Sequence, residues 1–302
     1  MGMRKFMFDL ENQIPRNKIK YNEPLRNHTF IRLGGEADIL VQPTTNEEIQ
    51  TVIDIARRNN VPLTILGKGS NTIIKDKGIR GITLSLSHFN QIEVKGCEIK
   101  AQSGADIIAV SRAALDHTLT GLEFACGIPG SVGGALYMNA GAYGGQVSDV
   151  LQSAHVLTRG GELLNLSGEE MELGYRKSIF RSDRYIILDA VFRLEEGDQA
   201  SISAKMNELT LARESKQPLE YPSCGSVFKR PEGHFAGKLI QDCQLQGTRI
   251  GGAEVSTKHA GFIVNVDNAT AQDYLDLIEH IQQKVREKFD VELETEVITL
   301  GE

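Results

Sequence analysis

Three short segments of this chain carry side chains that could bind or protonate a small acidic molecule. Arg176 lies in residues 174–180 (GYRKSIF), Ser226 in residues 223–231 (SCGSVFKRP), and Glu296 in residues 293–297 (LETEV). A guanidinium group is always charged and can bond a carboxylate through two N–H groups, so Arg176 could hold an anionic substrate. Ser226 lacks a GxSxG context and an evident His or Asp partner, which argues against a hydrolase nucleophile. From pattern alone, a surface arginine, a turn serine and two solvated glutamates are the simpler explanation.

A glycine-containing segment directly after a predicted strand could bind an anion through its backbone. Consecutive N–H groups in such a loop can point into one concavity, and hydroxyl and amide side chains add donors. The segment is neither a Walker A loop nor a GxGxxG fingerprint, and a plain turn would explain it equally well. The candidate cofactor-binding residues here are Leu66, Gly67, Lys68, Gly69, Ser70, Asn71 and Thr72.

A second glycine-rich segment covers residues 121–135. Its Pro129-Gly130 pair predicts a turn, and Ser131 could cap a helix that begins near Val132 and exposes amides to a phosphate. Glycines inside that helix cost about 1 kcal/mol each relative to alanine, so either tight helix–sheet packing or a ligand must offset them. Two separate cradles suit a dinucleotide better than a single phosphate. The candidates are Gly121, Glu123, Gly127, Ile128, Pro129, Gly130, Ser131, Gly133 and Gly134.

The periodicity of apolar residues predicts a mixed α+β chain that positions these segments. We expect helices over 47–59 (capped by Thr45 or Asn46), 105–115 and 199–215, and a long helix containing Leu277, Ile278, Ile281 and Val285. We expect strands over 63–66, 82–86, 186–194 and 291–300, and a hairpin of 154–158 with 162–166. The predicted domains are residues 1–199, in two lobes of about 1–86 and 87–199, and residues 200–302, whose last strand returns to the active site.

Composition excludes several classes of protein. The 302 residues carry a formal net charge of −7, which disfavours a non-specific nucleic-acid binder. The four cysteines have no zinc-type spacing, so we expect free thiols, no metal site and a reducing, cytoplasmic location. Residues 121–145 contain one charge, Glu123, but eight glycines, which makes them too polar in the backbone for a convincing membrane span.

The motifs taken together resemble a known family. Residues 27–38, 67–71, 121–123, 127–134 and 139–144 are similar to those of the UDP-N-acetylenolpyruvoylglucosamine reductase family, and the resemblance runs from about Arg26 to Val297. That family belongs to the flavoenzyme superfamily typified by vanillyl-alcohol oxidase and p-cresol methylhydroxylase. The resemblance implies an α+β fold with a two-lobed FAD-binding domain, which holds FAD non-covalently, followed by a smaller α+β substrate-binding domain.

The resemblance also implies roles for individual residues. Arg176 would hold the substrate carboxylate and its developing enolate, Ser226 would donate a proton, and Glu296 would polarise the carboxylate or enol. Ala140 joins the cofactor loops, and Tyr143, Tyr175, Lys229 and Lys238 are candidates to bind the substrate, a uridine diphosphate sugar. Only 30 residues separate Leu194 from Gly225, so the chain resembles the shorter form of the family, without an inserted tyrosine-bearing loop.

The implied reaction has two steps in one pocket. NADPH reduces the flavin, and UDP-N-acetylglucosamine enolpyruvate is then reduced to UDP-N-acetylmuramate for peptidoglycan synthesis, by a chain that we expect to be monomeric. One alternative is another flavoprotein of the superfamily, in which His28 or Cys126 could tether FAD covalently. A second alternative is a nucleotide-binding protein without catalytic activity.

Overall fold

The computed structural model describes residues 2–302 and leaves Met1 outside the described part. The chain divides into two compact units, each assembled from separate stretches of sequence. Unit 1 comprises the residues up to Tyr21, Ile39–Lys68 and Gly81–Ala212, and unit 2 comprises Asn22–Asp38, Gly69–Arg80 and Arg213–Glu302. The predicted boundary near residue 200 cuts the sequence only once, and the domain limits stay a prediction.

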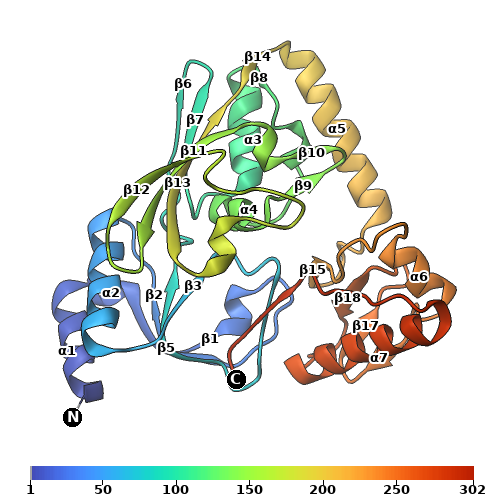
Figure 1. Cartoon of the computed structure of the whole chain (residues 1–302), viewed down its shortest axis with the longest axis horizontal. Helices are drawn as coiled ribbons and strands as arrows, with labels where there is room; N and C mark the ends of the chain where they lie inside the picture. Colours follow the sequence, from blue (N-terminus) through green and yellow to red (C-terminus); the bar gives the residue numbers. More distant parts are fainter. Residues whose placement is uncertain (1) are drawn as a thin grey trace. The chain divides into compact units, whose positions relative to one another are not determined.

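The first sheet has the strand order β1-β2-β5-β3. Its strands are β1 (Ile19–Pro24), β2 (Glu36–Val41), β5 (Ile79–Ser85) and β3 (Leu63–Leu66), and β3 runs parallel to β5. Helices α1 (Gly2–Gln13) and α2 (Asn46–Asn59) lie side by side (Figure 1). The predicted α2 is confirmed, since Thr45 caps it by accepting the Glu48 N–H at 3.2 Å, and Ile49, Val52 and Ile53 are buried.

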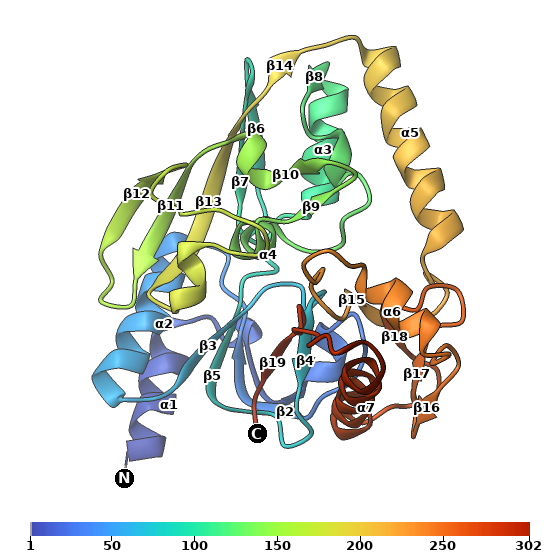
Figure 2. The ribbon, with the colours of Figure 1, turned by 45° about the vertical axis from the view of Figure 1, so that its right-hand side comes forward.

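The second sheet of unit 1 is antiparallel, in the order β12-β11-β13-β7-β6 (Figure 2). Its strands are β6 (Ile92–Lys95), β7 (Glu98–Gln102), β11 (Leu151–Thr158), β12 (Leu163–Ser167) and β13 (Tyr185–Arg193). Helices α3 (Ile107–Asp116) and α4 (Val132–Met138) accompany it, with the short pairs β8 (Leu119–Thr120) with β14 (Glu195–Glu196) and β9 (Gly141–Ala142) with β10 (Gly145–Gln146). The predicted hairpin of β11 and β12 is confirmed.

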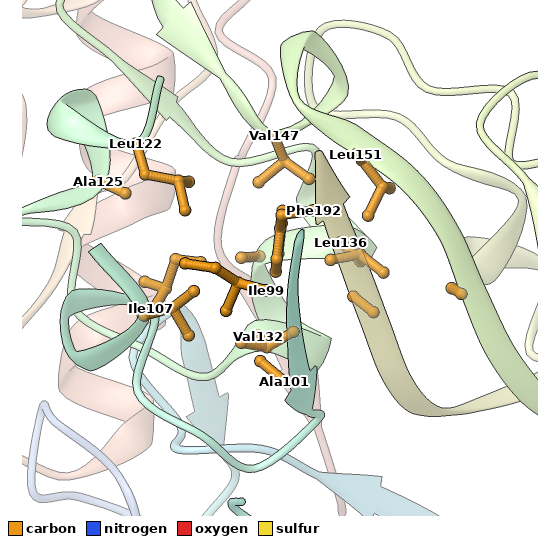
Figure 3. Packing of buried hydrophobic residues seen from close by; sticks show 14 of the residues in the cluster. Ile99, Ala101, Ile107, Leu122, Ala125, Val132, Leu136, Val147, Leu151 and Phe192 are labelled. Atoms are coloured by element: carbon orange, nitrogen blue, oxygen red, sulfur yellow. The ribbon is translucent and has the colours of Figure 1, made fainter. Parts of the chain in front are cut away.

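The core of this second lobe lies between the sheet and its helices (Figure 3). Val132 and Leu136 of α4 lie close to Ala101 of β7 and Phe192 of β13, and all four are buried. The helix that follows the glycine-rich segment is therefore anchored by its apolar face, which leaves its first turn to interact with other groups.

Unit 2 contains a four-stranded antiparallel sheet and a short parallel pair. The sheet has the order β15-β18-β17-β16, from β15 (Ser223–Ser226), β18 (Phe262–Asn265), β17 (Ala253–Val255) and β16 (Arg249–Ile250). The parallel pair is β4 (Thr72–Ile74) with β19 (Ile298–Leu300), which lie side by side in Figure 2. Helices α6 (Ala236–Asp242) and α7 (Ala271–Phe289) complete the unit, and α5 (Gln199–Lys216) ends in it.

Five single turns of 3₁₀ helix connect these elements: η1 (Arg16–Lys18), η2 (Leu25–His28), η3 (Glu123–Ala125), η4 (Val147–Asp149) and η5 (Ile179–Ser182).

Two predicted elements need correction. The helix predicted from Ala105 begins at Ile107, because the Ala105 carbonyl accepts the Val132 N–H at 2.8 Å and Asp106 forms a β-bridge with Ser131. The strand predicted over 291–300 is regular only over Ile298–Leu300. Residues 291–297 keep the expected alternation of buried and exposed side chains, but they pair with the rest of the unit through single bonds rather than through a continuous ladder.

Candidate active site

The two predicted cofactor loops are joined inside unit 1. The Lys68 ammonium group contacts the Asp106 carboxylate at 2.5 Å, and Asp106 in turn bridges Ser131. A Cβ atom added at Gly67 would lie 2.8 Å from the Ser131 hydroxyl oxygen, closer than real Cβ atoms come. Gly67 is therefore a glycine because the two loops touch there.

Ser131 has the capping role expected of it. Its hydroxyl oxygen accepts the Gly134 N–H at 3.3 Å at the start of α4, while the Gly133 N–H donates to the Ser103 carbonyl at 2.8 Å. A Cβ at Gly133 would meet the Ser103 Cβ at 3.0 Å, so tight packing explains that glycine. At Gly134, by contrast, the nearest atom is the Ser131 oxygen at 3.4 Å, an ordinary contact.

These observations fit a flat or phosphorylated ligand at the start of α4. The fold leaves room for alanine at Gly134, yet glycine is present at a cost of about 1 kcal/mol in a helix, so a ligand that approaches the backbone is the remaining reason. The neighbouring Ser103 hydroxyl is buried and has no hydrogen-bond partner among the described residues, which adds an unused polar atom beside the loop.

Other predicted cofactor residues are satisfied by the protein itself. Gly69 belongs to unit 2, has φ +63° and would place a Cβ 2.4 Å from the His28 carbonyl oxygen, so the chain requires glycine there. Glu123 accepts hydrogen bonds from the Thr120 hydroxyl at 2.6 Å and the Gly121 N–H at 2.8 Å. The cofactor roles of these residues stay predictions.

Three candidate substrate residues of unit 1 stand at the tips of two tight turns. Tyr143 and Gly144 connect β9 to β10, both with positive φ (54° and 92°), as a type I′ hairpin requires. Tyr175 and Arg176 are the central pair of a turn closed by reciprocal N–H···O bonds between Gly174 and Lys177.

The turn at Arg176 carries backbone strain. Arg176 has φ +53°, a conformation that costs a side-chain-bearing residue energy and that concentrates at functional sites. Its guanidinium carbon lies 5.4 Å from the centre of the exposed Tyr175 ring. The turn therefore presents a cation and an aromatic ring together.

Asn139 supports this turn and was not among the predicted site residues. It is buried, and its amide nitrogen donates to the Gly174 carbonyl at 3.2 Å while its oxygen accepts the Ser148 N–H at 2.9 Å. Its φ of +43° ends α4, and an asparagine directly after an apolar helix was the available signal.

Ser226 ends β15 next to a β-bulge. Ser223 pairs with Val264 and Ser226 with Phe262, so three steps on one strand match two on the other. Gly225 supplies the extra residue with φ +77°. The bulge turns Ser226 outward, and it is exposed between the buried Cys224 and Val227.

Glu296 lies beside Ser226 in unit 2. Its N–H donates to the carbonyl of Val227, the residue after Ser226, at 2.7 Å. The Lys229 N–H likewise donates to the Glu294 carbonyl at 2.8 Å. The Lys229 ammonium group forms an ion pair with the Glu294 carboxylate, so the structure pairs Lys229 with the exposed glutamate of the segment.

The remaining reactive side chains near Ser226 have structural roles. Burial raises the pKa of the Cys224 thiol to about 12, which makes it a poor nucleophile. Burial lowers the pKa of His259, whose Nδ1 accepts the Gly261 N–H at 3.1 Å and therefore belongs to a neutral ring. Lys238 is exposed and contacts Asp242 at 2.5 Å.

A cation–aromatic pair follows Ser226 that sequence reasoning did not single out. The Arg230 guanidinium carbon lies 4.0 Å from the centre of the Phe235 ring, which is 61% exposed. The interleaving of basic and aromatic residues over 228–238 was the signal for such a platform.

Comparison with known proteins agrees with this division of the chain. Residues 37–167 match the family model described as "FAD binding domain", and residues 217–300 match "UDP-N-acetylenolpyruvoylglucosamine reductase, C-terminal domain". The fold is similar to p-cresol methylhydroxylase, with a TM-score of 0.50 at 13% identity over 97% of this chain and 65% of that one. Fold and matched domain define an FAD-dependent oxidoreductase of the vanillyl-alcohol oxidase/p-cresol methylhydroxylase type.

The closer similarities specify the family. The chain is 64% identical over 289 residues to the UDP-N-acetylenolpyruvoylglucosamine reductase of Shouchella clausii (strain KSM-K16), covering 96% of this chain and 93% of the relative. It matches the crystal structure of the reductase from Thermus caldophilus with a TM-score of 0.80 at 32% identity, over 94% of this chain and 98% of that one. The chain belongs to the UDP-N-acetylenolpyruvoylglucosamine reductase family, and the predicted resemblance and fold class are confirmed.

Two searches of the described residues gave negative findings. None of the helices between residues 2 and 302 combines the length and apolar character needed to cross a bilayer. Over the same residues, no group of three or more His, Cys, Asp or Glu side chains could hold a metal ion.

Proposed function

We propose that this chain reduces UDP-N-acetylglucosamine enolpyruvate to UDP-N-acetylmuramate with NADPH, a step of peptidoglycan synthesis. The chemistry that FAD supplies when bound is hydride transfer, first from NADPH and then to the enolpyruvyl double bond. The residues that would hold FAD without a covalent bond are the two glycine loops, with the start of α4 at Gly134 as its closest approach.

The protein's own task is to manage the negative charge and the proton. Hydride addition leaves a strongly basic carbon next to the substrate carboxylate, and the exposed Ser226 hydroxyl is acidic enough to protonate such a carbon. Arg176, on its strained turn, binds the carboxylate and stabilises the enolate that develops. Glu296 polarises the same group from its position beside Val227.

The remaining candidates bind the nucleotide half of the substrate. Tyr143 and Tyr175 offer exposed rings at turn tips, and Lys229 and Lys238 offer positive charge near Ser226. We add Arg230 and Phe235, because a cation stacked on an exposed ring suits a base that is followed by a diphosphate. These residues would take the place of the tyrosine-bearing loop that the shorter form lacks.

The observation that carries the proposal is the bond between Glu296 N–H and the Val227 carbonyl at 2.7 Å. It brings two segments that are far apart in the sequence to one place, and both contain a residue suited to enolate protonation. Family membership supplies the substrate class.

The test is an anaerobic titration of the purified protein followed by its visible spectrum. NADPH should bleach the flavin band, and the enolpyruvyl sugar nucleotide should restore it with formation of one equivalent of product. A band that bleaches and stays bleached with this substrate would leave a flavoprotein but sink the substrate assignment.

Denaturation separates this proposal from the flavoprotein alternative. Acid-denatured protein should release all of its flavin, since His28 contacts Glu23 at 2.8 Å and the Cys126 thiol donates to the Met206 carbonyl at 3.5 Å. Flavin that stays with the precipitate would indicate a covalent tether. A colourless preparation that binds nucleotides without turnover would favour the non-catalytic alternative. We also propose that the enzyme acts in the cytoplasm as a monomer, which gel filtration would check.

A further inference from the structure

Asn71 belongs to the first glycine loop, yet its side chain reaches the segment that carries Glu296. The Asn71 amide nitrogen donates to the Glu296 carbonyl at 3.1 Å, across 225 positions of sequence. The Asn71 carbonyl accepts the Ile298 N–H at 3.0 Å. One residue therefore contacts the C-terminal segment on both sides of Val297.

The two bonds extend a regular pairing. Ile298 pairs with Thr72 where β19 begins alongside β4, so the ladder itself stops two residues after Glu296. The Asn71 side chain supplies the next bond, which the backbone alone does not make. Residues 69–80 and 213–302 belong to the same unit, so this contact is internal to unit 2.

Glu296 is held from its other side as well. Its N–H donates to the Val227 carbonyl at 2.7 Å, and Val227 follows Ser226 directly. Both backbone groups of Glu296 are therefore bonded, the N–H to the Ser226 strand and the carbonyl to the glycine loop. With its backbone fixed in this way, the carboxylate of Glu296 has a limited range of directions.

We propose that Asn71 is a positioning residue for Glu296, in addition to its expected place in the cofactor loop. Its amide fixes the Glu296 main chain relative to Ser226, and so it acts in the substrate-dependent half of the reaction. The inference rests on the proposed function, because it takes Glu296 to act on the substrate.

The test compares the two half-reactions in the flavin-saturated enzyme. In Asn71→Ala, the rate of flavin reoxidation by the enolpyruvyl substrate should fall about 10- to 100-fold, since misplacing a catalytic group by about 1 Å costs that order of rate. Flavin reduction by NADPH should stay within about 3-fold of the parent, because Glu296 has no part in it. Equal slowing of both half-reactions would overturn the inference.

A double-mutant cycle shows whether Asn71 acts through Glu296. In a Glu296→Ala background, Asn71→Ala should slow reoxidation by less than about 3-fold, because the group that it positions is already gone. The same 10- to 100-fold loss in both backgrounds would mean that Asn71 acts independently. Asn71→Asp keeps the size of the side chain but replaces the donor, so it should match Asn71→Ala; a parent-like rate would count against the bond.

The chain offers a matched control in Gln282. Its amide nitrogen donates to the Leu293 carbonyl at 2.8 Å, the same type of bond to the same segment but three residues before Glu296. Gln282→Ala should lower the melting temperature about as much as Asn71→Ala while both half-reactions keep their rates. If Gln282→Ala slows reoxidation equally, general loosening of the segment explains the effect and the inference fails.

The outcomes separate this inference from the function on which it rests. If Glu296→Ala alone leaves reoxidation intact, the proposed role of Glu296 is wrong and the role of Asn71 falls with it. If Glu296→Ala slows reoxidation and Asn71→Ala does not, only the positioning role is lost.

Discussion

The glycine loops of unit 1 and the Ser226–Glu296 region of unit 2 form their sites in opposite ways. In unit 1 the candidate groups are backbone amides, and the site exists because side chains are missing at Gly67, Gly133 and Gly134. In unit 2 the candidate groups are side chains, presented by a bulge at Gly225 and by single hydrogen bonds around Glu296.

This difference determines how each site can fail. A backbone site is damaged by added atoms, because a new methyl group occupies the space in which loops or a ligand approach. A side-chain site is damaged by removed atoms, because the reacting group or its support disappears. Substitutions of opposite kind should therefore separate cofactor binding from proton transfer.

The largest effect should come from removing the Ser226 hydroxyl. Ser226→Ala should slow reoxidation of the flavin by the enolpyruvyl substrate about 10²- to 10⁴-fold, the usual contribution of a positioned proton donor. Reduction by NADPH and flavin content should be unchanged, as stopped-flow absorbance would measure. Ser223→Ala, at the other side of the bulge, is the matched control. Equal loss in both half-reactions would contradict the assignment.

A methyl group at Gly134 should have opposite effects on stability and on flavin binding. The fold has room for it, with 3.4 Å to the nearest atom, so the apoprotein should gain up to about 1 kcal/mol of unfolding free energy. Flavin affinity should fall at least about 10-fold, equivalent to about 1.4 kcal/mol, if the cofactor approaches this backbone. Fluorescence titration of stripped protein and thermal melting measure the two effects.

Gly160→Ala controls for the methyl group itself. A Cβ at Gly160 would also lie 3.4 Å from a hydroxyl oxygen, that of Thr158, in the turn between β11 and β12. It should leave flavin affinity unchanged. A Gly134→Ala protein that binds flavin normally would mean that the cofactor lies elsewhere.

A methyl group at Gly67 should act through Ser131 and have a smaller effect. It would displace the Ser131 hydroxyl, 2.8 Å away, from its capping bond at α4, at a cost of about 1 kcal/mol. In a Ser131→Ala background most of this loss should vanish, since the clashing oxygen is absent. Denaturant melts of the four proteins measure the coupling, and strictly additive losses would place the clash at another atom.

The smallest expected effect concerns pH and unit 2. Burial lowers the pKa of His259, so the unfolded chain binds a proton there more readily than the folded chain does. Its contribution to stability should be complete above the ordinary pKa of about 6.5 and should be lost as the pH falls through the lower folded value. The difference in melting temperature between the parent and His259→Gln should therefore shrink on acidification, and a difference that grows would contradict a neutral His259.

Local sequence predicted most elements because local forces decide them. The cap at Thr45, the turn at Gly160-Gly161 and the cap at Ser131 each depend on contacts within about four residues, and all three are present. The last strand was predicted too long because alternation reports which side chains are buried, whereas a strand also needs a partner for each backbone group, and residues 291–297 find only scattered ones.

The sequence by itself therefore determined the family, the fold class, the helix and turn signals and the positions of the glycines. Only the tertiary structure decided which glycines the chain itself requires, as at Gly69, and which it leaves free, as at Gly134. It also decided that Lys229 pairs with Glu294 and that Asn71 bonds the Glu296 main chain. Such pairs lie far apart in the sequence, and their contact depends on the path of the whole chain, which local spacing does not encode.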